Sequence, residues 1–112
     1  MPTDMSDEPH FRRAIRADEL APEKSVPLEM DGKPILLCHS KGEFFAVANL
    51  CSHADEKLEC GLVRRGWVAC PMHGARFDLA TGNPINPPAT EPIATYPVRV
   101  QDGWVEIDSG NV

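Results

Sequence analysis

The sequence has too few basic residues for a protein that binds nucleic acid. It contains 11 lysines and arginines against 17 aspartates and glutamates, which gives a formal net charge of −6. A protein that neutralises phosphates needs a basic surface, so this balance argues against DNA or RNA as a partner. The same balance argues against a protein held on an anionic lipid surface.

Long hydrophobic runs are also missing. The longest is a few residues around 35–38, far short of the roughly 20 residues that a membrane-spanning helix needs. Residues 1–9, MPTDMSDEP, are acidic and polar, and they lack the basic start and apolar stretch of a secretory signal. We therefore expect no membrane association and a cytoplasmic location. In that compartment thiols stay reduced, so the four cysteines favour metal ligation or burial over disulfides.

Sustained helical periodicity is absent as well, and short apolar stretches alternate with glycine, proline and aspartate. Asp31-Gly32 and Asp102-Gly103 are typical of hairpin turns, and Pro27 favours an edge position for its strand. Many short strands separated by turns predict an all-β fold, a sandwich or a partly open barrel of antiparallel strands. We expect strands at residues 11–15, 25–30, 34–39, 43–48, 66–69, 95–101 and 104–108, with one helical turn or a tight turn at 17–20.

The length of 112 residues suits one domain. We expect a single domain over residues 1–112, with a flexible tail at 1–9. The segment 49–92 differs in character, because it contains three of the four cysteines and two of the four histidines. An unstructured loop of this length is uncommon in a compact domain, so the segment is predicted to be a subdomain that holds something.

Two short motifs in this segment carry metal-binding side chains. Cys51 and His53 form a Cys-x-His motif, and after sixteen intervening residues Cys70 and His73 form a Cys-x-x-His motif. Two cysteines and two histidines can hold one tetrahedral zinc ion, or a [2Fe–2S] cluster in which imidazoles replace two thiolates on one iron. Zinc fingers usually pair Cys with Cys and His with His, so the mixed pairing favours the cluster.

The two motifs resemble the cluster-binding motifs of Rieske proteins. The resemblance extends to Trp67, to the pairs 77–78 (FD) and 81–82 (TG), and to residues 86–90 (NPPAT), which look like the proline loop that covers the cluster. Residues 10–108 fit a small, stand-alone Rieske ferredoxin. The resemblance implies the Rieske fold, with antiparallel strands in a sandwich or partly open barrel and a small cluster-binding subdomain at 49–92.

The resemblance also implies a ligand set. Carried over to this sequence, Cys51 and Cys70 hold the inner iron of one [2Fe–2S] cluster, and His53 and His73 hold the outer iron. Cys60 and Cys38 are expected to be ordinary thiols, Cys38 as a small buried hydrophobe within an apolar strand. A disulfide between these two cysteines is the alternative.

The kind of Rieske protein follows from what the loops lack. Respiratory-chain Rieske subunits have an additional disulfide between the two cluster loops, and the matching positions here are Glu56 and Met72. Those subunits also have a serine and a tyrosine that donate hydrogen bonds to cluster sulfur, where this chain has Ala75 and Phe77. The resemblance is therefore to the low-potential ferredoxin component of aromatic-ring-hydroxylating dioxygenases.

This resemblance implies an electron carrier rather than an enzyme. The expected donor is an NAD(P)H-dependent flavoprotein ferredoxin reductase, and the expected acceptor is a terminal Rieske non-heme iron oxygenase. A carrier that visits two partners is most useful as a monomer, so we expect one. Two alternatives stay open: the small Rieske subunit of an assimilatory nitrite reductase, and, in another class, a zinc-stabilised interaction module.

The sequence predicts a midpoint potential at the low end of the Rieske range, about −150 mV. Hydrogen bonds to sulfur stabilise the reduced cluster, so loss of the two hydroxyl donors lowers the potential. Redox titration of the purified protein measures this value, and a midpoint well above zero would contradict the prediction.

Overall fold

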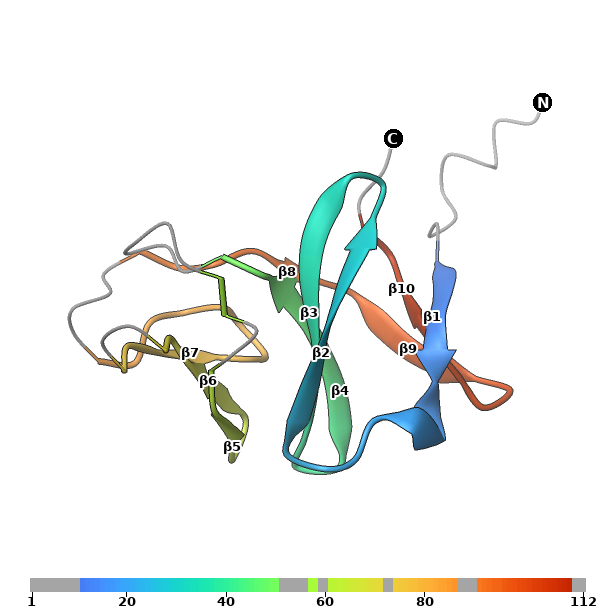
Figure 1. Cartoon of the computed structure of the whole chain (residues 1–112), viewed down its shortest axis with the longest axis horizontal. Helices are drawn as coiled ribbons and strands as arrows, with labels where there is room; N and C mark the ends of the chain where they lie inside the picture. Colours follow the sequence, from blue (N-terminus) through green and yellow to red (C-terminus); the bar gives the residue numbers. More distant parts are fainter. Residues whose placement is uncertain (1–10, 51–56, 59–60, 72–73, 87–90, 110–112) are drawn as a thin grey trace.

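A computed structural model describes residues 11–50, 57–58, 61–71, 74–86 and 91–109. In that part of the chain the strands form three antiparallel sheets, with the orders β1–β10–β9, β2–β3–β4–β8 and β5–β6–β7 (Figure 1). The elements are β1 (Arg12–Arg16), a 3-10 helix η2 (Ala17–Glu19), β2 (Lys24–Met30), β3 (Lys33–Ser40), β4 (Glu43–Ala48), β5 (Val63–Arg64), β6 (Trp67–Ala69), β7 (Arg76–Asp78), β8 (Thr95–Tyr96), β9 (Val98–Gln101) and β10 (Trp104–Ile107).

The all-β prediction is confirmed, and most expected strands lie within a residue or two of their observed positions. Pro27 lies in β2, the outermost strand of its sheet, as its missing N–H requires. The expected strand at 95–101 is wrong in one respect: it is divided at Pro97 into β8 and β9, which join different sheets. The sequence prediction also missed β5 and β7, which are only two and three residues long.

Strand β3 lies at the centre of the molecule, between two apolar cores. Ile35 and Leu37 point into one core, which they share with Val105 and Ile107 of β10. Leu36 and Cys38 point into the other core, which also contains residues of β5, β6 and β7. Because side chains alternate along a strand, this single run of apolar residues packs on both faces of its sheet. All four of these β3 side chains are completely buried.

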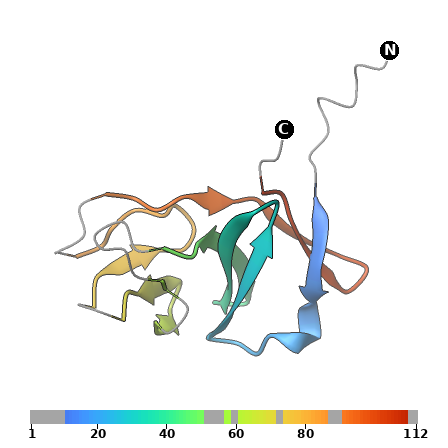
Figure 2. The ribbon, with the colours of Figure 1, turned by 45° about the horizontal axis from the view of Figure 1, so that its top comes forward.

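The middle sheet therefore separates the two others. Figures 1 and 2 show the β2–β3–β4 strands between the β1–β9–β10 sheet and the small β5–β6–β7 sheet. The small sheet lies entirely within the expected subdomain at 49–92. Where the chain leaves β4 it is held beside the returning chain, because the amide of Ala48 donates to the carbonyl of Ala94 at 2.9 Å. Within the described residues, no helix is long and apolar enough to cross a membrane.

Gly82 is the glycine that the returning chain depends on. It has a left-handed φ of +79°, and a Cβ atom at this position would collide with the carbonyl oxygen of Ile93. Its own carbonyl accepts a hydrogen bond from the Ile93 amide at 2.8 Å. Gly82 thus allows two backbone segments to approach more closely than any side chain would permit.

We predict that Gly82→Ala destabilises the fold by more than Gly42→Ala. Gly42 has a similar φ of +74° but nothing within 4 Å of its Cβ position, so it reports the conformational strain alone. That strain is worth about 1–3 kcal/mol, and the collision adds to it only at Gly82. Urea unfolding of both variants measures the difference. Equal losses of stability would show that the close approach to Ile93 does not matter.

Candidate functional site

Cys70 comes directly after β6, at the start of a tight turn. Its amide donates to the carbonyl of Ala75 at 2.7 Å, and its carbonyl accepts from the amide of Gly74 at 3.0 Å. Gly74 has a φ of +72°, which a residue without a side chain adopts readily. The turn is therefore closed by backbone hydrogen bonds from both sides, and it holds Cys70 in a fixed position.

The side chains around Cys70 form a dry, apolar environment. Cys70 itself is 1% exposed, and it belongs to the same core as Val68, Ala75 and Phe77. Leu58 lies in this core too, and it comes shortly after the first of the two motifs. The chain around one motif thus packs on the same core as the turn that begins the other.

The segment that contains the first motif is closed at its base by a side chain. The side-chain oxygen of Asn49 accepts a hydrogen bond from the amide of Leu58 at 2.9 Å. Asn49 is 2% exposed, and its amide donates to the carbonyl of Pro34 at 3.1 Å. Residues 49 and 58 are therefore tied together and fastened to the start of β3.

Asn86 makes a similar connection at the second motif. Its side-chain oxygen accepts from the amide of Arg76 at 2.7 Å, and its side-chain nitrogen donates to the carbonyl of Gly74 at 3.4 Å. The neighbouring amide of Ile85 donates to the carbonyl of Arg76 at 2.7 Å. The start of the predicted proline loop thus lies against the turn that follows Cys70.

Of the four predicted ligands, the structure places Cys70. Cys51, His53 and His73 lie outside the described residues, as do Cys60 and residues 87–90 of the predicted proline loop. Among the side chains that are described, no three of the metal-binding types gather at one point. The ligand set therefore stays a prediction, and Cys70 is the one of its four positions that the structure describes, as a buried side chain at the start of a turn.

Cys38 is a different kind of cysteine. It is a free thiol, fully buried in the middle of β3. Burial raises its pKa to about 12, because the apolar core disfavours the thiolate. A metal ligand must be a thiolate, so Cys38 is a core residue, as the sequence predicted. Cys60, the partner of Cys38 in the alternative disulfide, lies outside the described residues.

The family of this chain is shown by its similarity to known proteins. Residues 10–97 match the family model for the Rieske [2Fe-2S] domain. The chain belongs to the Rieske family. Its cofactor is one Rieske-type [2Fe–2S] cluster, and the residues present fit it: the sequence supplies two thiols and two imidazoles in paired motifs, and the one described ligand candidate, Cys70, is buried at the start of a turn.

Relatives of this Rieske protein include ferredoxin components. The ferredoxin subunit of anthranilate 1,2-dioxygenase from Burkholderia cepacia is 39% identical over 93 residues, which cover 83% of this chain and 86% of the relative. The ferredoxin component of the naphthalene 1,2-dioxygenase system from Pseudomonas putida is 32% identical over 95 residues, covering 85% and 91%.

Solved structures agree. The ferredoxin of carbazole 1,9a-dioxygenase from Nocardioides aromaticivorans IC177 has a TM-score of 0.81 at 30% identity, over 87% of this chain and 95% of that chain. The ferredoxin of Sphingomonas yanoikuyae B1 has a TM-score of 0.82 at 33% identity, over 89% and 99%. The match spans nearly the whole of each ferredoxin, so the expected Rieske fold is confirmed.

Sequence reasoning missed the side chains that brace the motifs. Asn49 and Asn86 stand in loops, where asparagine is common, and nothing in their spacing shows that they bond amides nine and ten residues away. The absence of hydroxyl donors after the second motif was visible in the sequence. The structure adds that Ala75 and Phe77 are both fully buried beside Cys70.

We predict that Asn86→Ala loosens the second motif and Asn83→Ala does not. The first change leaves the part-buried Arg76 amide without its acceptor, which costs about 1 kcal/mol. Asn83 is exposed and contributes only backbone hydrogen bonds. Iron release to a chelator, followed by the loss of visible absorbance, is expected to be faster in Asn86→Ala. Equal rates in the two variants would contradict the role of Asn86.

Proposed function

We propose that this Rieske ferredoxin carries single electrons from an NAD(P)H-dependent flavoprotein reductase to a terminal Rieske non-heme iron oxygenase that acts on an aromatic compound. The observation that carries the proposal is the extent of the match. Relatives named as ferredoxin components of dioxygenase systems align over more than four fifths of this chain and of their own length. The chain acts as an electron carrier and not as the enzyme that binds the substrate.

A comparison with oxygenases supports this assignment. The terminal oxygenase of carbazole 1,9a-dioxygenase from Nocardioides aromaticivorans IC177 aligns with 94% of this chain at 30% identity, but with only 31% of its own length. The same chain covers 95% of the corresponding ferredoxin. This protein therefore matches a whole ferredoxin and only a part of an oxygenase.

We propose Cys51 and Cys70 as ligands of the inner iron, and His53 and His73 as ligands of the outer iron. The cluster supplies the one-electron redox chemistry. The chain holds it between two motifs that come from different sheets, and the core around Cys70 keeps water from the thiolate side. Respiratory Rieske subunits have hydroxyl groups at the positions of Ala75 and Phe77, and these donate hydrogen bonds to cluster sulfur. This chain lacks both hydroxyls, so its reduced cluster is less stabilised, which favours a low potential.

The relatives indicate the electron acceptor, and the need for NAD(P)H indicates the donor and the location. The relatives above belong to dioxygenase systems, which favours an oxygenase as acceptor over nitrite reductase. The zinc alternative does not fit membership of the Rieske family. A flavoprotein reductase is the expected donor, because it converts the hydride pair of NAD(P)H into single electrons. We propose the cytoplasm, where NAD(P)H is available, and a monomer that visits the two partners in turn.

The test combines electron transfer with a matched pair of cysteine variants. Wild-type protein is expected to contain two iron atoms and two acid-labile sulfides per chain, the composition of one [2Fe–2S] cluster. We expect it to be reduced by NAD(P)H and a dioxygenase reductase, and reoxidised by the oxygenase as substrate is consumed. Cys70→Ala removes a ligand and is expected to abolish the cluster signal.

Cys38→Ala is the control for this variant. Cys38 is equally buried but lies in the middle of β3, so its loss is expected to lower stability while the cluster signal stays. Cluster retention in Cys70→Ala would overturn the ligand assignment. Wild-type protein that holds iron and sulfide but fails to pass electrons to any oxygenase would overturn the proposed function.

A further inference from the structure

Glu23 has an unusual backbone conformation, and its carboxylate accepts hydrogen bonds from several donors in other parts of the chain. It comes directly before β2, with a left-handed φ of 62°. Its amide donates to the carbonyl of His39 at 2.6 Å, which fixes it beside the end of β3. A glutamate rarely adopts this conformation without compensation from its surroundings. The contacts of its carboxylate supply that compensation.

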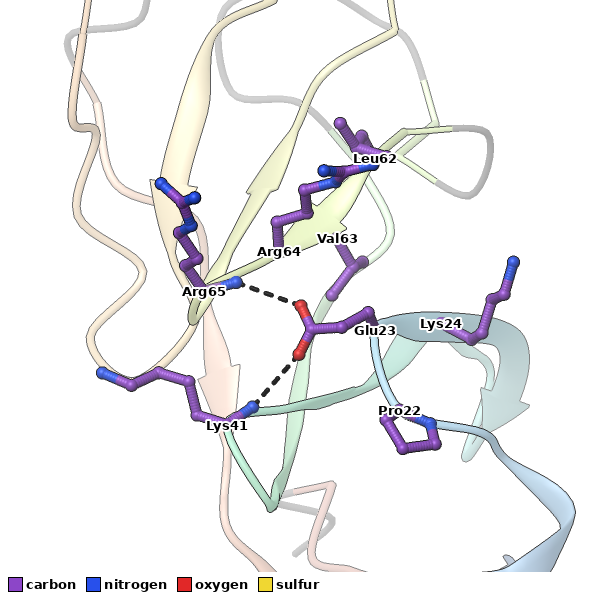
Figure 3. A pocket seen from close by; sticks show the side chains of 8 residues that line it. All are labelled: Pro22, Glu23, Lys24, Lys41, Leu62, Val63, Arg64 and Arg65. Carbon is purple, nitrogen blue, oxygen red and sulfur yellow. Dashed lines mark hydrogen bonds between the residues drawn. The ribbon is translucent and has the colours of Figure 1, made fainter.

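The carboxylate of Glu23 joins two turns that are distant in the sequence. It accepts hydrogen bonds from the amide of Lys41 at 3.3 Å and from the amide of Arg65 at 3.0 Å (Figure 3). The buried hydroxyl of Ser40 approaches both carboxylate oxygens, at 3.1 and 3.0 Å. The same hydroxyl oxygen accepts a hydrogen bond from the amide of Gly66 at 2.8 Å.

These turns close the two hairpins from which the cluster motifs extend. Residues 41–42 connect β3 to β4, and residues 65–66 connect β5 to β6. At its other end β4 stops at Ala48, three residues before Cys51, and β6 stops at Ala69, next to Cys70. A shift of one hairpin along the other would therefore change the spacing between the two motifs.

The covalent connections do not prevent such a shift. The chain leaves β4 and returns to β8 side by side, where Ala48 bonds to Ala94, so both links to the small sheet lie at the same end of β4. Apolar packing between the sheets is non-directional, so it resists separation more than sliding or rotation. Glu23 provides a directional attachment at the opposite end of both hairpins.

We propose that Glu23 is a positioning residue whose carboxylate locks the β5–β6 turn to the β3–β4 turn and so sets the spacing of the two cluster-binding motifs. The inference rests on the proposed ligand set. We call the hydrogen bonds that this carboxylate accepts the Glu23 clasp. The clasp does not touch the cluster; it acts through the strands that lead to the ligands.

A charged carboxylate suits this position better than an amide. All the groups that face it are donors, so two anionic oxygens accept where an amide would present one oxygen and an opposing NH2 group. Four of the residues that line the same pocket beside Glu23 are basic, and the other three are apolar; the basic residues are Lys24, Lys41, Arg64 and Arg65 (Figure 3). Desolvation raises the pKa of Glu23, but the hydrogen bonds from the two turns and the charge of Arg64 outweigh it and hold the pKa below its usual range. The clasp is therefore fully charged at neutral pH, and it is lost only as the pH falls through this lowered pKa.

The test compares Glu23→Gln with Glu29→Gln at pH 7. Glu29 is an exposed carboxylate on β2, six residues after Glu23, so its replacement removes one negative charge without touching either turn. In Glu23→Gln we expect the Arg65 and Gly66 amides to exchange with deuterium about tenfold faster, relative to the amides of β10. We also expect faster iron release to a chelator and a broader spread of g-values in the spectrum of the reduced cluster. Glu29→Gln is expected to match the wild type in all three measurements.

Ser40→Ala provides a second variant, because it keeps the charge but removes the hydroxyl that connects the carboxylate to Gly66. It is expected to change the same measurements in the same direction. Unchanged g-values and iron release in both variants would overturn the proposal. So would changes that merely follow the global free energy of unfolding, because those would indicate a structural role alone.

Failure of the proposed function gives a different result. Wild-type protein without iron and sulfide would refute the cluster, whereas the exchange rates of the Arg65 and Gly66 amides would still report whether the Glu23 clasp exists.

Discussion

The double burial of β3 is the constraint on which the rest of the structure depends. Leu36 pairs with Val47 on one face of the sheet, and Leu37 pairs with Ala46 on the other. The first pair faces the small sheet that leads to Cys70, and the second faces the sheet of β1, β9 and β10. Because the two cores share one strand, a register shift of one residue would move each β3 side chain to the opposite core. The predicted cluster-binding part is thus built on a strand that is buried on both faces.

Two cores with one shared strand explain why the small sheet can be so short. Strands of two and three residues cannot form a stable sheet alone, since they bury too little apolar area. Here the small sheet packs on a face of β3 and β4 that would otherwise be exposed to water. Its contacts come from the side chains of Val63, Val68 and Phe77. Packing on the middle sheet therefore stabilises the small sheet. Polar contacts fix its position, such as those of Asn49, Asn86 and Glu23. Apolar burial provides the energy, and directional hydrogen bonds provide the alignment.

The sequence could predict the features that depend on local backbone geometry, but not the contacts between distant parts of the chain. Turn dipeptides such as Asp31-Gly32, and the proline at position 27, depend on local backbone geometry, so they located hairpins and an edge strand correctly. The paired motifs were visible because ligands must lie close together in a tight loop. In contrast, Glu23 meets an amide 42 residues away, and no local pattern encodes such a contact. The short strands β5 and β7 were missed for the same reason, since they exist only through packing on β3 and β4.

The contrast between Cys38 and Cys70 shows why burial alone does not identify a ligand. Both thiols are almost fully removed from water, and both belong to the same apolar core. Cys38 lies within a regular strand whose backbone groups bond to β2 and β4, and burial in the apolar core raises its pKa, which keeps the thiol protonated at neutral pH. Cys70 comes where β6 has ended, in a turn whose backbone bonds are made locally, from its own amide to Ala75 and from Gly74 to its carbonyl. Residues that bind metals and ligands are commonly placed on such loops at the ends of strands. Position within the backbone, and not the degree of burial, therefore separates the proposed ligand Cys70 from the core cysteine Cys38.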